Sequence, residues 1–252
     1  MMALLSVAGL CRSFGGIRAV DNIDFQINAG TIMGIIGPNG AGKTSLFNVL
    51  TGFLKADAGS VRVDGQEVLG RSPHQLVTLG MARSFQLVKP FFGMRVRETL
   101  ELPLWAPRQR KQGRNATEIS MEVTQLATRI GLQDRLDILV DQLTQGELRM
   151  LDIGRALATQ PRILFLDEPF SGLSQEEVGI LSELITSIKA SGMAIVIIEH
   201  RLRELMALAE RVMVINFGTK LAEGYPNEIV RNAQVIEAYL GIKGGQLATS
   251  TR

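Results

Sequence analysis

The sequence predicts an α/β fold: a mainly parallel sheet covered by helices, with an antiparallel β region near the start and an inserted helical subdomain. Three observations predict it. Short, continuously apolar segments alternate with helical segments in the last third of the chain, as in parallel sheets buried on both faces. Strands and tight turns alternate early in the chain, and helical periodicity dominates from about residue 96 to residue 158.

The antiparallel strands are predicted first along the chain. An apolar strand runs from the first residues through Leu10. Residues 22–27 alternate apolar and polar side chains, which predicts a strand with one buried face. Residues 60–63 lead into Asp64-Gly65, a strong β-hairpin signal.

The parallel part is predicted from apolar strands that are each followed by a helix. A strand over 31–36 stops at a glycine-rich turn and a helix follows over 43–50. Further along, the pattern predicts a strand over 163–166, a helix over 174–190, a strand over 194–198, a short helix near 201–209 and a strand over 211–215. These elements follow the βαβ order of a parallel sheet.

One domain accounts for most of the chain. We expect residues 1–240 to form it, with an α/β core made of 1–86 and 159–240 and a helical subdomain over 87–158. A polar stretch, 107–115, interrupts the helical pattern, and residues 241–252 read as a frayed tail.

Composition excludes several classes of protein. The 252 residues are 46% hydrophobic, which suits a folded globule, and the net charge of +2 gives no strong attraction to nucleic acid. A single cysteine, Cys11, excludes an internal disulfide. The longest apolar runs are far shorter than the roughly 20 residues that cross a bilayer, so we expect a soluble chain that reaches a membrane only through a partner.

The strongest chemical signal is a complete G-x-x-x-x-G-K-T motif that lies between a strand and a helix. Glycines let backbone amides wrap a phosphate, the lysine neutralises the β- and γ-phosphates, and the threonine hydroxyl ligates Mg²⁺. A glycine-rich turn without a ligand is the alternative. The predicted phosphate-binding residues are Gly37, Pro38, Asn39, Gly40, Ala41, Gly42, Lys43, Thr44 and Ser45.

Two adjacent carboxylates end a buried strand. Asp167 and Glu168 follow the apolar residues 163–166. An acid at the carboxyl end of a strand near a phosphate loop can hold Mg²⁺, and a second acid can orient and polarise the attacking water. Together with the glycine loop, this pair predicts hydrolysis of ATP or GTP.

Further motifs, in order and spacing, resemble the ATP-binding subunit of an ABC transporter from Leu5 to Leu240. The resemblance rests on an early aromatic residue, a glutamine after the Ala-Arg-Ser-Phe sequence, a Leu-Thr-Gln-Gly-Glu signature segment, a Ser-Gly-Leu-Ser loop and an Ile-Glu-His turn. These are, in order, Phe14, Gln86, residues 143–147, residues 171–174 and residues 198–200.

The resemblance implies a P-loop NTPase fold and a role for each matching residue. ATP and Mg²⁺ are the implied cofactors. The implied catalytic residues are Lys43, Gln86, Glu168 and His200, and the implied magnesium ligands are Thr44, Gln86 and Asp167. Phe14 stands where the family stacks a ring on adenine, while Thr144, Gln145 and Gly146 face the γ-phosphate of a second ATP-binding subunit. ATP would then close a homo- or heterodimer that drives transmembrane permease subunits.

Finer features resemble importers of branched-chain amino acids. They are Glu199-His200, the Phe217-Gly-Thr hairpin and residues 237–241. Such importers work with a separate solute-binding protein, at the cytoplasmic face of the inner membrane. The Glu168-Pro169-Phe170 sequence leaves a lipopolysaccharide exporter open as an alternative. A regulatory ATP-binding subunit with low turnover is a further alternative, whereas an ATPase that acts on DNA or ribosomes would carry two cassettes or long coiled coils.

Three motifs depart from the family pattern. In the signature, Gln145 replaces the third residue and Glu147 ends the motif. Ser174 replaces an Asp or Asn, and Arg201 follows the histidine where Asp is customary. Our hypothesis is that this chain's own nucleotide site is competent and that the signature offered to the partner is weakened. An apolar loop with Phe91, Phe92 and Met94 is predicted to belong to a groove that receives a permease helix.

Overall fold

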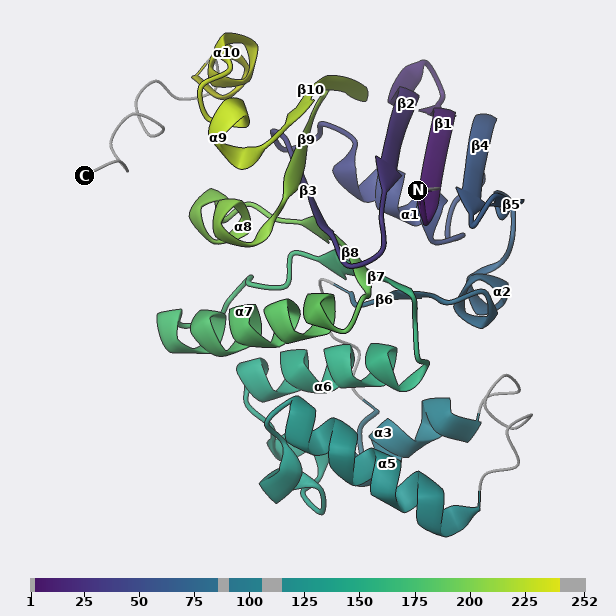
Figure 1. The fold of residues 1–252 in the computed structure, drawn as a ribbon, viewed down its shortest axis with the longest axis vertical. Helices are drawn as coiled ribbons and strands as arrows, with labels where there is room; N and C mark the ends of the chain where they lie inside the picture. Colours follow the sequence, from purple (N-terminus) through teal and green to yellow (C-terminus); the bar gives the residue numbers. More distant parts are fainter. Residues whose placement is uncertain (1–2, 86–90, 106–114, 241–252) are drawn as a thin grey trace. The chain divides into compact units, whose positions relative to one another are not determined.

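A computed structural model describes residues 3–85, 91–105 and 115–240 (Figure 1). The chain divides into two compact units. Unit 1 consists of Met1–Pro73 and Ala194–Arg252, and unit 2 consists of His74–Met193. Each unit is described by itself.

Unit 1 contains the predicted antiparallel sheet, in the order β2-β1-β4-β5. The strands are β1 (Leu5–Phe14), β2 (Ile17–Ile27), β4 (Ala58–Val63) and β5 (Gln66–Glu67). The hairpin at Asp64-Gly65 is confirmed: both residues have positive φ, 49° and 77°, as a tight two-residue β-turn requires. The second strand begins five residues earlier than predicted, because its first residues are largely exposed and show no apolar alternation.

Parallel strands form the other sheet of unit 1. β3 (Ile32–Ile36) pairs in parallel with both β8 (Ala194–Ile198) and β9 (Arg211–Asn216), while β10 (Thr219–Gly224) pairs antiparallel with β9. Every residue of β3 and β8 is buried, which confirms the prediction from their continuous apolar sequence. The helices of this unit are α1 (Lys43–Leu50), α8 (Leu202–Leu208), α9 (Pro226–Ile229) and α10 (Ala233–Leu240). The sequence did not predict α9 or α10.

Unit 2 combines a parallel strand pair with the predicted helical region. β6 (Met81–Arg83) pairs in parallel with β7 (Ile163–Asp167). The helices are α2 (Pro73–Thr78), α3 (Val96–Glu101), α5 (Ala116–Arg129), α6 (Gln145–Ala158) and α7 (Gln175–Ala190), with short 3₁₀ turns at Leu102–Trp105, Gln133–Arg135 and Val140–Gln142. The predicted apolar stripe of α7 is confirmed, since its five members are all buried: Val178, Leu181, Leu184, Ile185 and Ile188.

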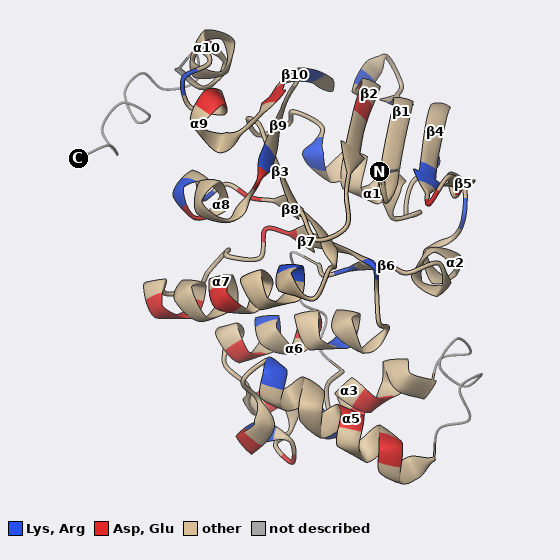
Figure 2. Cartoon of the chain, in the orientation of Figure 1, with Lys and Arg blue, Asp and Glu red and all other residues tan. Residues whose placement is uncertain are grey.

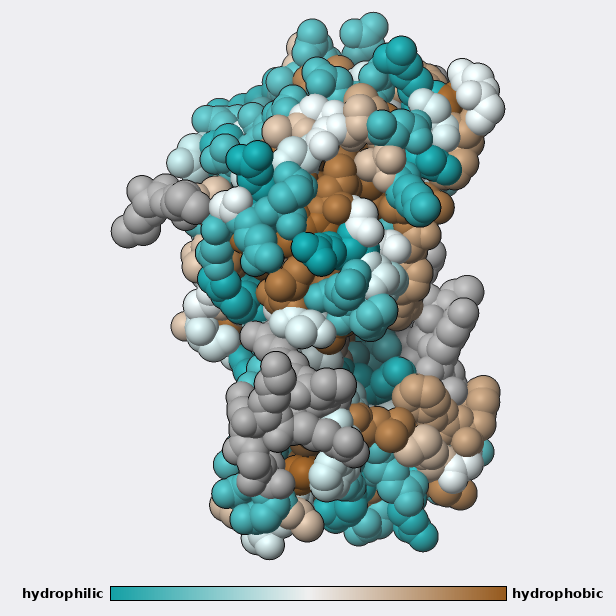
Figure 3. Space-filling view, turned by 90° about the vertical axis from the view of Figure 1, so that its right-hand side faces the viewer, coloured by the Kyte–Doolittle hydropathy of each residue, from teal (hydrophilic) through white to brown (hydrophobic). Residues whose placement is uncertain are grey.

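The helices carry charged side chains of both signs. On α6, for example, Glu147, Arg149, Asp152 and Arg155 follow one another (Figure 2). In the described part of the chain, no helix is both long enough and apolar enough to cross a bilayer. Apolar side chains also reach the surface, as one face of the molecule shows (Figure 3). Those exposed in unit 2 include Phe91, Phe92, Leu102 and Trp105.

Candidate functional site

The glycine motif forms a tight loop between β3 and α1 in unit 1. A side chain at Gly37 would place its Cβ 2.1 Å from the backbone oxygen of Ile215. At Gly42, with φ of 104°, a Cβ would lie 2.0 Å from the backbone oxygen of Ala19. Only glycine fits at either position. The loop therefore keeps its backbone close to β2 and β9, and its last glycine leads directly into the helix at Lys43.

Lys43 is buried at the base of this loop, with 6% of its surface exposed. Its Nζ donates hydrogen bonds to the backbone oxygens of Gly37 (2.7 Å) and Pro38 (2.9 Å). A buried ammonium ion must be paired or hydrogen-bonded, and here loop carbonyls supply the acceptors. The ammonium is thus held under the loop, where the positive end of α1 also favours an anion.

The aromatic residue that is predicted to stack on adenine also lies in unit 1. Phe14 ends β1, is 43% exposed, and pairs with Ile17 across the β1–β2 turn. The guanidinium of Arg12 lies 4.8 Å from the centre of its ring. Because Ala19, two residues beyond Ile17, contacts the loop at Gly42, this turn lies a short distance from the loop along β2. An exposed aromatic ring so close to a phosphate loop can stack on a base.

The turn after β8 presents the predicted histidine. His200 is exposed, whereas the neighbouring Glu199 is buried, with 2% of its surface exposed. One carboxylate oxygen of Glu199 accepts hydrogen bonds from the backbone N–H groups of His200 (2.7 Å) and Arg201 (3.1 Å). Glu199 therefore fixes the backbone that carries the histidine.

In unit 2, the acid pair lies at the end of β7. Asp167 is buried, and its Oδ2 accepts a hydrogen bond of 2.6 Å from the guanidinium of Arg83 on β6. Glu168 follows with φ of 47°, a left-handed conformation that is uncommon for a residue with a side chain. Such backbone strain often accompanies a functional position.

The sequence did not identify Arg83 as part of this site. It lies 84 residues before Asp167, and only the β6–β7 pairing brings the two together. Its guanidinium also lies 5.2 Å from the centre of the Phe85 ring. The predicted metal ligand is thus held in a charged, buried pair, which sequence spacing could not reveal.

Replacing Arg83 by Gln is expected to lower the free energy of unfolding by about 3 kcal/mol, because the carboxylate of Asp167 would stay buried without its cation. Urea denaturation measures this. The exposed pair of Arg62 and Glu67 (3.5 Å apart) offers a control, and Arg62→Gln should change stability by less than about 1 kcal/mol. If both substitutions lower the free energy of unfolding equally, burial does not make the Arg83–Asp167 pair more important for stability than the exposed pair.

Two side chains of α6 hold the backbone just before the predicted glutamine. Asp152 accepts a hydrogen bond from the N–H of Phe85 (3.0 Å), and Arg149 donates one to the carbonyl oxygen of Phe85 (2.6 Å). Both side chains are buried, and burial raises the pKa of Asp152 despite the Phe85 N–H and the nearby arginines. Gln86 itself lies outside the described residues, so its predicted role is not tested.

The signature segment starts α6. Thr144 caps the helix: its hydroxyl accepts a hydrogen bond from the N–H of Glu147, and the Glu147 carboxylate accepts one from the N–H of Thr144 (2.8 Å). The same carboxylate pairs with the guanidinium of Arg135 at 2.8 Å. The departure at this position therefore has a structural function, since the carboxylate caps the helix and binds an arginine of its own chain.

The neighbouring signature residues contact the start of α7. A Cβ at Gly146 would lie 2.1 Å from a carboxylate oxygen of Glu177, and one at Gly172 would lie 2.4 Å from the amide nitrogen of Gln145. Ser174, the second departure, caps α7 through the N–H of Glu177 (3.3 Å). Serine is among the preferred capping residues, so it retains the helix-starting function that Asp or Asn would supply.

Replacing Glu147 by Gln should lower stability by about 0.5–1 kcal/mol at pH 7. Partial burial alone would raise the pKa of Glu147, but the Thr144 N–H and the Arg135 guanidinium outweigh it and lower the pKa below 4.5. The charge therefore stabilises the fold fully above pH 4.5, and this contribution is lost as the pH falls through the lowered pKa. Denaturation curves at several pH values should show the difference between the two proteins vanishing in acid. If the stability difference persists in acid, it arises from packing and not from the charge of Glu147. The control is Glu183→Gln, at an exposed position on α7.

Comparisons with known proteins agree with this geometry. The family model described as ABC transporter matches residues 20–171, and the one described as branched-chain amino acid ATP-binding cassette transporter matches residues 219–242. The chain is 38% identical to LivG, the high-affinity branched-chain amino acid transport ATP-binding protein of Escherichia coli K12, over 94% of this chain and 98% of that protein. It is 34% identical to the corresponding BraF protein of Pseudomonas aeruginosa, with the same coverage.

Solved structures show the same relationship. The ADP conformation of MJ1267, an ATP-binding cassette of an ABC transporter, superimposes with a TM-score of 0.86 at 30% identity and covers 96% of this chain and 100% of that one. A nucleotide-free cassette from an ABC transporter gives a TM-score of 0.83 at 29% identity, over 94% of this chain and 99% of that one. The phosphate loop, the acid pair and these similarities over nearly the whole length lead to one conclusion: the chain belongs to the ATP-binding subunits of ABC transporters and is an ATPase.

Proposed function

We propose that this ATPase energises the import of branched-chain amino acids or related small solutes. The observation that carries the proposal is the match of β10, α9 and α10 (residues 219–242) to the branched-chain amino acid transporter family model. Relatives named for that transport, matched over nearly their full length, support it. None of these matches favours the lipopolysaccharide exporter.

The phosphate loop and Lys43 bind the triphosphate in this proposal. The buried ammonium under Gly37 and Pro38 places a positive charge below the loop, and the amides of residues 39–45 and the N-terminus of α1 surround the phosphates. Phe14 stacks on adenine, which its exposure at the β1–β2 turn supports.

Thr44, Gln86 and Asp167 are the proposed ligands of Mg²⁺. All three offer oxygen atoms, the donors this ion prefers, and Mg²⁺ commonly takes one carboxylate together with substrate phosphates. When bound, the ion would neutralise charge that develops on the transferred phosphoryl group. Asp167 supplies the carboxylate of this set, and Thr44 and Gln86 supply hydroxyl and amide oxygens, so the donor set fits a divalent cation.

Glu168 and His200 act on the attacking water and the γ-phosphate. Glu168 follows Asp167 directly, and its left-handed backbone turns the chain out of β7 at this point. It orients the water and accepts its proton. His200, held by Glu199, senses the γ-phosphate through its exposed imidazole.

A second ATP-binding subunit completes the site. Thr144, Gln145 and Gly146 at the positive end of α6 face the γ-phosphate held by that partner, where charge develops during transfer. The internal pairing of Glu147 with Arg135 supports a competent signature rather than a weakened one. Permease subunits hold the dimer at the cytoplasmic face of the inner membrane, and a solute-binding protein delivers the solute.

Uptake by a reconstituted transporter tests the proposal. This chain, a second ATP-binding subunit, two permease subunits and the binding protein are assembled in liposomes, and ATP-dependent uptake of labelled leucine is measured. We expect uptake that Glu168→Gln abolishes. ATP hydrolysis without uptake of leucine, isoleucine, valine or a related solute would reject the proposed substrate class but not the ATPase.

A further inference from the structure

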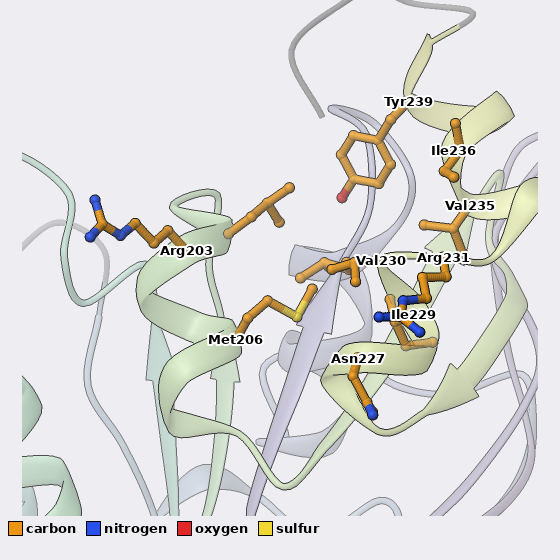
Figure 4. Close-up of a pocket in the computed structure, with 11 residues that line it drawn as sticks. Arg203, Met206, Asn227, Ile229, Val230, Arg231, Val235, Ile236 and Tyr239 are labelled. Carbon is orange, nitrogen blue, oxygen red and sulfur yellow. The ribbon is translucent and has the colours of Figure 1, made fainter. Parts of the chain in front are cut away.

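Arg83 is buried, in contrast to the arginines of unit 1 that line a cavity. This cavity has a volume of about 490 Å³ and a mostly apolar lining, to which Arg203 and Arg231 contribute exposed side chains (Figure 4). In unit 2, by comparison, only 7% of the Arg83 side chain and 5% of the Asp167 side chain are exposed. Removing a guanidinium from water is unfavourable unless an anion compensates for it, so the burial of Arg83 depends on its ion pair with Asp167.

Sheet pairing fixes the position of Arg83. It is the last residue of β6 and lies opposite Phe165 of β7. The next N–H, that of Ser84, donates a hydrogen bond of 2.9 Å to the carbonyl oxygen of Phe165. The ring of Phe85 lies 5.2 Å from the guanidinium. Backbone pairing therefore keeps the guanidinium beside the end of β7, where Asp167 lies.

The ion pair occupies one oxygen of Asp167. Nη2 of Arg83 donates a hydrogen bond of 2.6 Å to Oδ2, and the described residues supply no hydrogen-bond donor to Oδ1. A carboxylate that is held through one oxygen presents the other to a metal ion. Mg²⁺ usually keeps several waters and binds one or two carboxylates together with substrate phosphates, so this arrangement suits the role proposed for Asp167.

The charge of Arg83 opposes a second cation at the same carboxylate. The opposite charges of Asp167 and Arg83 compensate each other in the ion pair. A divalent cation brought to Asp167 alone would meet the positive guanidinium in a buried place, where solvent and salt screen the repulsion little. The negative charges of a triphosphate that accompanies the ion offset this repulsion.

We propose that Arg83 is a positioning residue that makes binding of the divalent cation at Asp167 depend on the nucleotide. The inference rests on the proposed role of Asp167 as a magnesium ligand. Arg83 acts through Asp167 in two ways: it holds Oδ2 and leaves Oδ1 to bind the ion, and its charge disfavours an ion that arrives without phosphates. The cation therefore enters and leaves the site together with the nucleotide.

Binding of Mn²⁺, a paramagnetic substitute for Mg²⁺, to the full chain tests the proposal. Electron paramagnetic resonance measures the Mn²⁺ affinity of the nucleotide-free chain and of the chain with a prebound non-hydrolysable ATP analogue. The parent is compared with Arg83→Gln, which removes the charge, and with Arg83→Lys, which keeps it. Arg203→Gln makes the first change at an exposed position, and Met81→Ala removes buried apolar contacts from β6 without a change of charge.

Without nucleotide, we expect Arg83→Gln to bind Mn²⁺ at least about tenfold more tightly than the parent, because the opposing charge is gone and both oxygens of Asp167 are available. With the analogue bound, the two affinities should agree within about threefold, since the loss of the opposing charge is offset there by the loss of a fixed Asp167. Arg83→Lys and the two controls should bind Mn²⁺ as the parent does. Mn²⁺ should also raise the unfolding temperature of Arg83→Gln more than that of the parent.

Equal or weaker binding of Mn²⁺ by nucleotide-free Arg83→Gln would overturn the proposal, and so would equal tightening in Met81→Ala. If Arg83→Gln does not fold, the parent decides the question. It must bind Mn²⁺ at least about tenfold more weakly without the analogue than with it, and equally tight binding in both states would contradict the proposal.

Asp167→Asn distinguishes this inference from the ligand set on which it rests. If this variant leaves the Mn²⁺ affinity of the analogue-bound chain unchanged, Asp167 is not a ligand and both proposals fail. If Asp167→Asn weakens Mn²⁺ binding but Arg83→Gln has no effect in either state, only the inference about Arg83 fails.

Discussion

Replacing Glu168 by Gln is expected to lower the ATPase rate of the assembled transporter by about 10²- to 10³-fold and to leave ATP binding within a fewfold of the parent. The amide keeps the shape of the side chain but cannot accept a proton from the attacking water. Asp167 and its partner Arg83 are unchanged, so the buried pair at the end of β7 persists. The rate of phosphate release and the binding of a fluorescent ATP analogue measure the two quantities separately.

A matched control uses the same substitution nearby. Glu176→Gln, in the exposed first turn of α7, changes the net charge equally and should leave the rate within twofold. Unchanged turnover in Glu168→Gln would remove this residue from its assigned role. A fall in binding as large as the fall in rate would instead assign it to the nucleotide pocket.

Replacing Lys43 by Ala should reduce affinity for ATP by at least about 100-fold. The ammonium would otherwise make charge-assisted hydrogen bonds to the phosphates, and such bonds are roughly twice as strong as neutral ones. The substitution also leaves the carbonyls of Gly37 and Pro38 without their donor. Titration with a fluorescent ATP analogue measures affinity, and thermal unfolding shows whether the chain still folds.

Lys55→Ala is the control for Lys43→Ala, because Lys55 is exposed and lies outside the loop. It should change affinity by less than about twofold. Retention of tight binding by a folded Lys43→Ala protein would mean that the loop amides alone hold the triphosphate. The proposed role of the buried ammonium would then be wrong.

Much of the fold follows from local sequence patterns. The strand over 194–198 and the helix over 43–50 were predicted with the bounds that the structure has. The predicted helix over 174–190 begins one residue later, because Ser174 is its cap rather than its first residue. Apolar periodicity, glycine turns and capping residues are all local signals, which explains why these predictions are accurate.

Features that depend on distant residues were not predicted. The pairing of Arg83 with Asp167, for example, requires β6 to lie beside β7. Helix α9, with only four residues, is too short to show helical periodicity. The pairing of Glu147 with Arg135, twelve residues earlier in the chain, was likewise not predicted.

The central claim is that a companion subunit completes each hydrolytic centre by capping the triphosphate with its own signature. The most direct measurement is the ATPase rate per mole of this chain at increasing concentrations of itself and of the second ATP-binding subunit. We predict a rate near zero for dilute chain alone, which rises as subunits associate and is lost when the added partner carries a disrupted signature. Full activity from isolated monomers, at a rate per mole that does not change with concentration, would contradict the account.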